Sequence, residues 1–168
     1  MAMTNIMVDL ETLDTKASAV ILSIGACRFD ENEIDNDGFY RVITIQSCID
    51  EGRTISGSTL KWWMDQSERA KAVLNDPAAI PLEDALNDLR AWIGPANLKT
   101  AQPWGNSARF DLGILEHAYG RQELPWMFYN EKCFRMLKMT VHYDGGRNEV
   151  EREIEGGDFI TREAFEQA

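Results

Sequence analysis

The sequence has little positive charge, few cysteines and histidines, and no long apolar run. Its 168 residues contain 17 Lys and Arg against 28 Asp and Glu, which gives a formal net charge of −11. Proteins that hold nucleic acid through many contacts with phosphates are usually basic. The acidic balance therefore argues against tight passive binding of a polyanion. It leaves open an enzyme in which bound divalent cations supply the positive charge.

The scarcity of cysteine excludes two further classes of protein. Cys27, Cys48 and Cys133 lie far apart and form no CxxC pair, so neither a structural zinc site nor a disulfide framework is predicted. We expect reduced, mostly buried thiols in a cytoplasmic protein. No apolar run approaches the roughly 20 residues that span a bilayer. The first residues show no basic segment followed by an apolar stretch, so no secretion signal is expected.

The order of the expected elements predicts a single mixed α/β domain over residues 1–168. Branched and aromatic residues predict strands, the first three of them as an antiparallel meander. These strands cover residues 5–11, 19–29, 39–45 and 100–106. Capping residues and apolar spacing predict the helices. These helices cover residues 58–64, 67–74, 81–93, 108–119 and 131–141, and residues 161–168 begin like a further capped helix.

Asp9 and Glu11 form the first candidate for a functional site. They lie two residues apart at the end of the first expected strand, so both carboxylates project from the same face. Two anions this close repel each other unless a cation lies between them, and oxygen ligands suit Mg²⁺ or Mn²⁺ rather than zinc. The alternative interpretation is a solvated surface pair with no ligand.

Asp111 is the second candidate. It falls in the first turn of an expected helix that directly follows the strand over residues 100–106. A carboxylate at that position interacts favourably with the helix dipole, so its presence has an ordinary structural explanation when it is considered alone.

Together these segments resemble the DEDD exonucleases, the superfamily that contains proofreading exonucleases and oligoribonuclease. Their first motif, Asp-x-Glu on the first strand, is matched by Asp9 and Glu11. Their second, an Asn followed by Phe-Asp at a strand-to-helix junction, is matched by Asn106, Phe110 and Asp111. The segments DLETLDT and LKWWMDQS, at residues 9–15 and 60–67, are most similar to the exodeoxyribonuclease VIII-like and small exoribonuclease branch. The resemblance covers about residues 4–140.

The resemblance implies a ribonuclease H-like fold, with a mixed central sheet flanked by helices. It also implies a metal-dependent 3′–5′ exonuclease that releases nucleoside monophosphates from the ends of single-stranded DNA or RNA. Asp9, Glu11 and Asp111 would be the catalytic metal ligands. Two Mg²⁺ or Mn²⁺ ions are expected in the family, and a single remaining ion is the alternative for this chain. A homodimer is implied as one option.

The resemblance also assigns substrate contacts. Thr12 and Leu13 would contact the terminal nucleotide, with Leu13 wedged against its base. Asn106 would orient the backbone near the second motif, and Phe110 would face the substrate. The neighbouring residues Trp62 and Trp63 are further candidates for substrate contact.

Trp62 and Trp63 point about 100° apart on a helix, so both cannot lie in one buried stripe. One is expected in the core, and the other is free to stack on a base.

The third motif of the superfamily is absent. It supplies a general base and a fourth carboxylate, as His followed five residues later by Asp or Tyr followed four residues later by Asp. Neither His117 nor His142 has an Asp at the required distance. Three explanations stay open: a chain that lacks its C-terminal helix, a late carboxylate such as Asp144 or Asp158 in its place, or a weak or inactive relative that binds nucleic acid. An unrelated α/β protein with acidic surface pairs is the remaining alternative.

Overall fold

A five-stranded mixed sheet forms the centre of the computed structural model, which describes residues 3–120 and 123–143. The strands are β1 (Asn5–Thr12), β2 (Ile21–Phe29), β3 (Phe39–Val42), β4 (Gln102–Gly105) and β5 (Lys132–Cys133). Their order in the sheet is β3-β2-β1-β4-β5. β1, β2 and β3 pair antiparallel, as predicted, whereas β4 runs parallel to β1.

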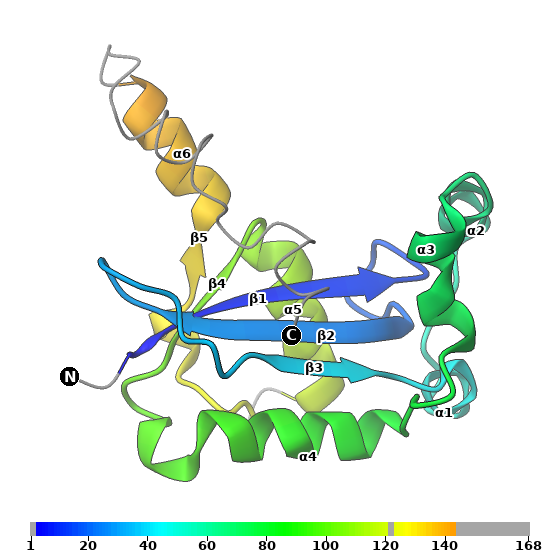
Figure 1. Ribbon diagram of the computed structural model, residues 1–168, viewed down its shortest axis with the longest axis horizontal. Coiled ribbons are helices and arrows are strands. Elements are labelled where there is room, and N and C mark those ends of the chain that lie inside the picture. Colours follow the sequence, from blue (N-terminus) through cyan, green and yellow to red (C-terminus); the bar gives the residue numbers. More distant parts are fainter. Residues whose placement is uncertain (1–2, 121–122, 144–168) are drawn as a thin grey trace.

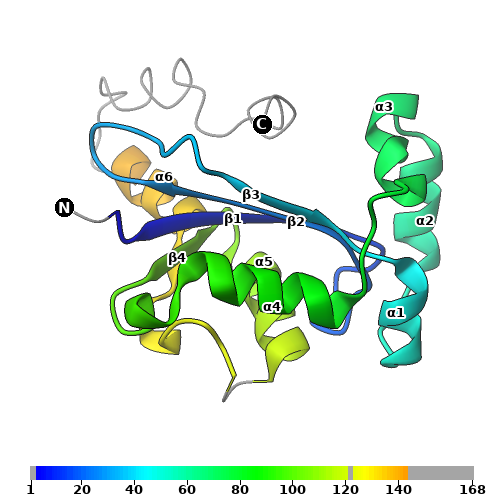
Figure 2. The ribbon, with the colours of Figure 1, turned by 60° about the horizontal axis from the view of Figure 1, so that its bottom comes forward.

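Six helices and three short turns surround this sheet among the described residues. They are α1 (Ile45–Asp50), α2 (Gly57–Met64), α3 (Glu68–Lys71), α4 (Leu82–Ile93), α5 (Ala108–Tyr119) and α6 (Phe134–Tyr143), with short 3₁₀ turns η1 (Ala72–Asn75), η2 (Pro95–Asn97) and η3 (Phe128–Asn130). Helices α4 and α5 cover one face of the sheet, and α1, α2 and α3 gather at one end of it (Figure 1, Figure 2). The α/β architecture is the predicted one and is consistent with a ribonuclease H-like fold.

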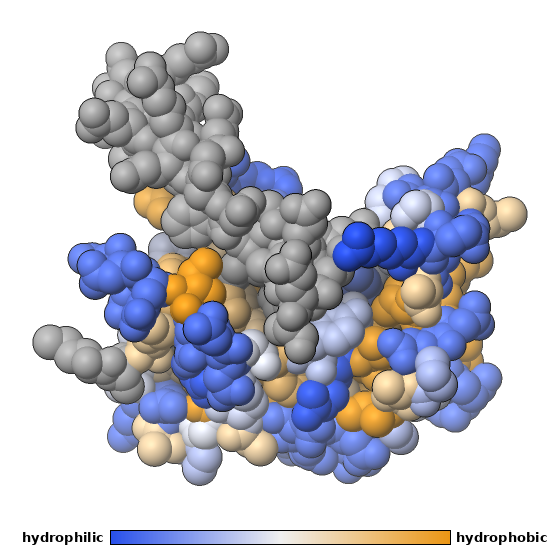
Figure 3. Space-filling view, viewed as in Figure 1, coloured by the Kyte–Doolittle hydropathy of each residue, from blue (hydrophilic) through white to orange (hydrophobic). Residues whose placement is uncertain are grey.

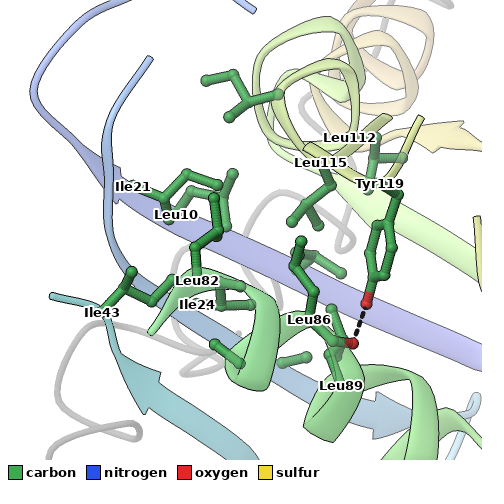
Figure 4. Close-up of a cluster of buried hydrophobic side chains, with 14 of the residues drawn as sticks. Leu10, Ile21, Ile24, Ile43, Leu82, Leu86, Leu89, Leu112, Leu115 and Tyr119 are labelled. Atoms are coloured by element: carbon green, nitrogen blue, oxygen red, sulfur yellow. Dashed lines mark hydrogen bonds between the residues drawn. The ribbon is translucent and has the colours of Figure 1, made fainter. Parts of the chain in front are cut away.

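The apolar face predicted for α4 is buried in the core between this helix and the sheet. Its members are Leu82, Ala85, Leu86, Leu89 and Ile93. Figure 4 shows leucines of α4 packed beside the labelled leucines of α5 and residues of β1 and β2. The phenolic hydroxyl of Tyr119 donates a hydrogen bond of 2.5 Å to the backbone oxygen of Leu86, which ties α5 to α4.

The predicted strand over residues 39–45 is too long. β3 ends at Val42, and a short helix, α1, begins at Ile45. The reason lies in backbone pairing: Thr44 donates to the backbone oxygen of Ile80, and an isolated bridge joins Ile43 to Ile80. Ile43 still donates to the backbone oxygen of Leu22 in β2, so the change of partner comes at Thr44, whose bond is to a residue distant in sequence that local patterns do not reveal.

The predicted start of the last helix, at residue 131, is also wrong. β5 comes first, pairing in parallel with the end of β4, and α6 begins at Phe134. A two-residue strand has no periodicity from which it can be predicted. The further helix expected over residues 161–168 lies outside the described residues.

The cysteines and the apolar character of the helices were the subject of two predictions from the sequence. The three cysteine thiols are free, and Cys27 and Cys48 are buried while Cys133 is half-buried. Within residues 3–120 and 123–143, no helix combines the length and apolar character that a membrane crossing requires.

Candidate functional site

β1 presents the two motif carboxylates on one face of the sheet, as predicted. Val8 and Leu10 are buried in the core, whereas Asp9 is exposed and Glu11 is half-buried. Both carboxylates line one cavity of about 360 Å³. The pairing of β1 with β2 is irregular between Glu11 and Thr12. Such bulges redirect side chains and are frequent next to functional sites.

Asp111 reaches β1 because β4 is short. β4 pairs with β1 only as far as Trp104 opposite Met7, and the chain then turns into α5. Beyond that point the N–H of Leu10 donates to Oδ1 of Asp111 at 3.3 Å. The carboxylate therefore accepts the hydrogen bond that a backbone oxygen of β4 would accept if the strand were longer. Asp111 is only 3% exposed.

Burial makes Asp111 an unusual carboxylate. Loss of solvation is the main cause that raises its pKa to about 7, and the nearby charge of Asp9 adds to the effect. Hydrogen bonds from the backbone of Ser107 and Leu10 act in the opposite direction without cancelling it. The pair Asp9 and Asp111 is thus a place where added positive charge would be favourable.

Gly105 makes the approach of Asp111 possible. A Cβ at Gly105 would lie 3.0 Å from Oδ2 of Asp111 and 3.2 Å from the Cα of Ala108. The backbone of α5 would have to move to relieve this contact, so substitution disturbs both the helix start and the carboxylate.

We expect Gly105→Ala to destabilise the fold by about 1–3 kcal/mol, the usual cost of overpacking. Gly113→Ala is the matched control, because a Cβ at Gly113 in α5 meets nothing within 4 Å. That change should stabilise the protein by up to about 1 kcal/mol through helix propensity. Urea unfolding of both variants measures the difference, and equal midpoints would contradict the steric role of Gly105.

A second cavity, of about 340 Å³, adjoins the first at Glu11. Besides Leu10 and Glu11 it is lined by hydroxyl-bearing and aromatic side chains, which are Thr12, Thr15, Ser58, Thr59, Trp62 and Phe110. The indole of Trp62 is 50% exposed. Three of the predicted substrate contacts, Thr12, Trp62 and Phe110, therefore lie around one cavity beside the carboxylates.

Two residues predicted to contact the substrate are buried in the core instead. Trp63 and Leu13 are each 2% exposed and belong to the core. The indole N–H of Trp63 donates to the backbone oxygen of Thr12 at 2.9 Å. This hydrogen bond attaches α2 to the last residue of β1. Leu13 cannot wedge against a base while it is buried. Asn106 is exposed in the turn before α5 and lines neither of these cavities.

Sequence reasoning missed a buried carboxylate, Asp14, that fixes the loop after β1. Its oxygens accept hydrogen bonds of 2.7 Å from the hydroxyl of Thr54 and from the N–H of Thr15. The hydrogen bond from Thr54 is the main reason that the pKa of Asp14 is lowered. Thr54 lies 40 residues away in sequence, so no local pattern predicts this contact.

The predicted ligands do not form a closed metal cage. Among the described residues, no three His, Cys, Asp or Glu side chains gather closely enough to hold an ion by themselves. Mg²⁺ is usually bound by one or two carboxylates together with waters and substrate phosphates, so it requires fewer protein ligands than a closed site supplies. Carboxylate oxygens are also the hard donors that this ion prefers.

The described part of the chain places no candidate for the missing third motif at these cavities. His117 is exposed on α5, and its Nδ1 lies 3.5 Å from Nη1 of Arg53. The side chain of His142 lies outside the described residues, as do Asp144 and Asp158. The explanations for the missing third motif therefore stay open.

Comparison with known proteins gives a family match and a solved structure of similar fold. The family model described as the 3′–5′ exoribonuclease Rv2179c-like domain matches residues 4–168. No curated protein matches the chain. The crystal structure of cell-death related nuclease 4 (CRN-4) is similar with a TM-score of 0.54 and 12% identity, over 86% of this chain and 49% of that chain. The chain thus spans about half the length of that nuclease, and the similarity supports the fold.

Proposed function

The chain belongs to the family of 3′–5′ exoribonuclease Rv2179c-like domains, and on this premise we propose that it removes nucleotides from the 3′ ends of single-stranded RNA. The observation that carries the proposal is that buried Asp111 accepts a hydrogen bond from the backbone of Leu10, the neighbour of Asp9, while Asp9 lines a cavity that Asp111 itself does not line. The contact joins two segments about a hundred residues apart, and the first of them includes Glu11 on the same face of β1. Surface decoration does not explain a carboxylate that is buried at a cost in solvation.

Each carboxylate has a distinct position in this proposal. Asp9 and Glu11 line the cavity from the strand, and Asp111, at the start of α5, is near enough to Asp9 for the charge of Asp9 to raise its pKa. A divalent ion bound by these oxygens would activate a water molecule and neutralise charge at the reacting phosphate. In this proposal Asp9, Glu11 and Asp111 would hold that ion next to β1.

The second cavity is suited to the terminal nucleoside. Trp62 and Phe110 offer aromatic faces, and stacking on a base contributes about 1–3 kcal/mol in single-strand binders. Thr15 and Ser58 bring hydroxyl groups to the same cavity, whereas the hydroxyl of buried Thr12 donates to the backbone oxygen of Asp14. Hydroxyl side chains donate and accept hydrogen bonds, as ribose hydroxyls do.

The test uses a 5′-labelled single-stranded RNA with Mn²⁺ and resolves the products by length. A ladder that shortens from the 3′ end, and that EDTA abolishes, supports the proposal. A parallel DNA strand of the same sequence measures the preference for ribose. An intact RNA in every divalent ion, together with RNA binding that persists in EDTA, would contradict the enzyme and favour a non-catalytic binding domain on the same fold.

Trp62→Ala should weaken RNA binding about tenfold while leaving stability nearly unchanged, because Trp62 is half exposed at the cavity. Trp63→Ala is its counterpart. It removes a fully buried indole and should cost about 3–5 kcal/mol of unfolding free energy. Fluorescence anisotropy and urea unfolding measure the two quantities. Equal effects of both substitutions on binding and stability would contradict the division of roles.

A further inference from the structure

Two segments that lie far apart in the sequence both line the second cavity. Thr15 belongs to the loop that joins β1 to β2, whereas Ser58, Thr59 and Trp62 belong to α2. The shape of this cavity therefore depends on how the loop after β1 and the start of α2 are held relative to each other. Residues 53–56, just before α2, form hydrogen bonds with that loop.

Helix α2 is attached to the protein core through few side chains of its own. Its buried residue is Trp63. Leu60, Trp62 and Met64 are exposed, and Figure 3 shows apolar side chains among hydrophilic ones on the surface at this end of the molecule. A single buried indole fixes a helix at one point, so the position of the first turn of α2 depends on the chain that precedes it.

The backbone of Thr54 joins this preceding chain to the loop after β1. Its N–H donates to the backbone oxygen of Ser18 at 2.7 Å, and its oxygen accepts from the N–H of Val20 at 2.9 Å. Two residues later the N–H of Ser56 donates to the backbone oxygen of Leu13 at 2.8 Å. These three hydrogen bonds connect both ends of the loop to the segment that leads into α2.

The hydroxyl of Thr54 adds a side-chain contact with the same loop. It donates to Oδ2 of Asp14 at 2.7 Å and lies 2.9 Å from the hydroxyl of Ser18. A hydroxyl has one proton, so Thr54 gives its proton to Asp14 and accepts one from Ser18. The resulting order, from Ser18 to Thr54 to Asp14, is a chain in which each hydrogen bond polarises the next.

Asp14 connects this chain of hydrogen bonds to the cavity. The residue is only 3% exposed, and its second oxygen, Oδ1, accepts from the N–H of Thr15 at 2.7 Å. One carboxylate thus holds the hydroxyl of Thr54 and the backbone of Thr15. A buried acceptor that loses a donor pays the cost of its lost solvation, so this arrangement resists change.

We propose that Thr54 is a positioning residue for the second cavity: by binding Asp14, it sets the place of Thr15 relative to the start of α2 and so the fit of the terminal nucleoside. The inference rests on the proposed function. Thr54 lines neither cavity at the carboxylates, so its effect on the substrate passes through Asp14 and Thr15. Because these contacts of Thr54 are all with the loop after β1, we expect their loss to change binding more than the chemical step.

The test compares Thr54→Val with the wild type, because valine has the shape of threonine and lacks the hydroxyl. Initial rates of RNA shortening with Mn²⁺ give kcat and KM, and uridine 5′-monophosphate as competitor reports on the terminal position alone. We expect Thr54→Val to raise KM and the inhibition constant about tenfold through weaker stacking and to change kcat by less than about twofold. Thr54→Ser keeps the hydroxyl and should restore both values to those of the wild type.

Ser47→Ala is the matched control for lost stability. The hydroxyl of Ser47 also makes two hydrogen bonds, donating to the backbone oxygen of Thr44 at 2.7 Å and accepting from the N–H of Leu82 at 3.0 Å. Ser47 lines neither cavity at the carboxylates, so its variant should lose stability in urea unfolding and keep the wild-type KM. An equal rise in KM for Ser47→Ala and Thr54→Val would show a general effect of stability and overturn the inference.

Ser18→Ala is a second variant, because it removes only the outer donor of the chain that ends at Asp14. It should raise KM in the same direction as Thr54→Val, by a smaller factor. A wild-type KM in Thr54→Val, or in Ser18→Ala should Thr54→Val not fold, would overturn this inference alone, since the wild type still shortens RNA. A wild type that neither binds uridine 5′-monophosphate nor shortens RNA would overturn the proposed function and this inference with it.

Discussion

Asp111→Asn is expected to stabilise the ion-free protein by about 4 kcal/mol at pH 8 and to leave its stability unchanged near pH 4. The carboxyl has a pKa of about 7 in the folded protein against 3.8 in its ordinary state. The folded state therefore binds the extra proton between these values, and the unfolding free energy of the wild type falls as pH rises through them. Each pKa unit corresponds to about 1.4 kcal/mol.

The amide avoids this cost because it carries no charge at any pH. Its oxygen still accepts the hydrogen bond from the N–H of Leu10, and its NH₂ group can donate to Asp9. Urea unfolding in EDTA at several pH values measures the effect. Parallel pH dependences for wild type and variant would show that Asp111 is not a destabilised anion.

Asp14→Asn is the control, because its expected effect on the unfolding free energy has the opposite sign to that of Asp111→Asn. Hydrogen bonding from Thr54 lowers the pKa of Asp14 below its usual value. The charged form of Asp14 thus stabilises the fold above the unfolded-state pKa, and that contribution is lost as pH falls through the folded-state pKa. Asp14→Asn should therefore destabilise the protein at neutral pH, whereas Asp111→Asn stabilises it.

Asp9→Asn is expected to lower the rate of RNA shortening at least about 10²–10³-fold. Positive charge held at a reacting phosphate contributes several kcal/mol of transition-state stabilisation, and each 1.4 kcal/mol is a tenfold change in rate. Loss of Asp9 removes one of the two carboxylates of β1, Asp9 and Glu11, that line the cavity. Initial rates with a labelled strand and Mn²⁺ measure the loss.

Asp88→Asn controls for the change from acid to amide. Asp88 pairs with Arg41 at 2.7 Å on the surface, with both side chains 43% exposed, and lines neither cavity at the carboxylates. Its variant should retain the wild-type rate. A wild-type rate in Asp9→Asn as well would assign any activity to other residues or to a contaminating nuclease.

The local pattern of the sequence was sufficient for the main elements. Branched residues over residues 5–11 and 19–29 predicted β1 and β2, and their alternation placed Asp9 and Glu11 on one face. The apolar spacing after Pro81 predicted the buried face of α4. These predictions succeed because periodicity in sequence directly records which face of an element loses water.

Local patterns failed where the partner of a segment lies far along the chain. Backbone bonding to Ile80 ends β3, and pairing with β4 creates β5. Burial of Trp63 rather than Trp62 depends on which side of α2 meets the end of β1. Neighbouring tryptophans have the same propensity, so only packing distinguishes them.

The sequence by itself determined the α/β class and the placement of Asp9 and Glu11 on one strand face, with Asp111 at the start of a helix; the role of these residues as metal ligands stays a prediction. Tertiary structure decided that Asp111 is buried against Leu10, that Leu13 and Trp63 serve the core, and that Thr54 binds Asp14. The physical reason is that residue type and spacing fix the face of an element, whereas burial, pKa and the facing groups arise only when distant segments exclude water together.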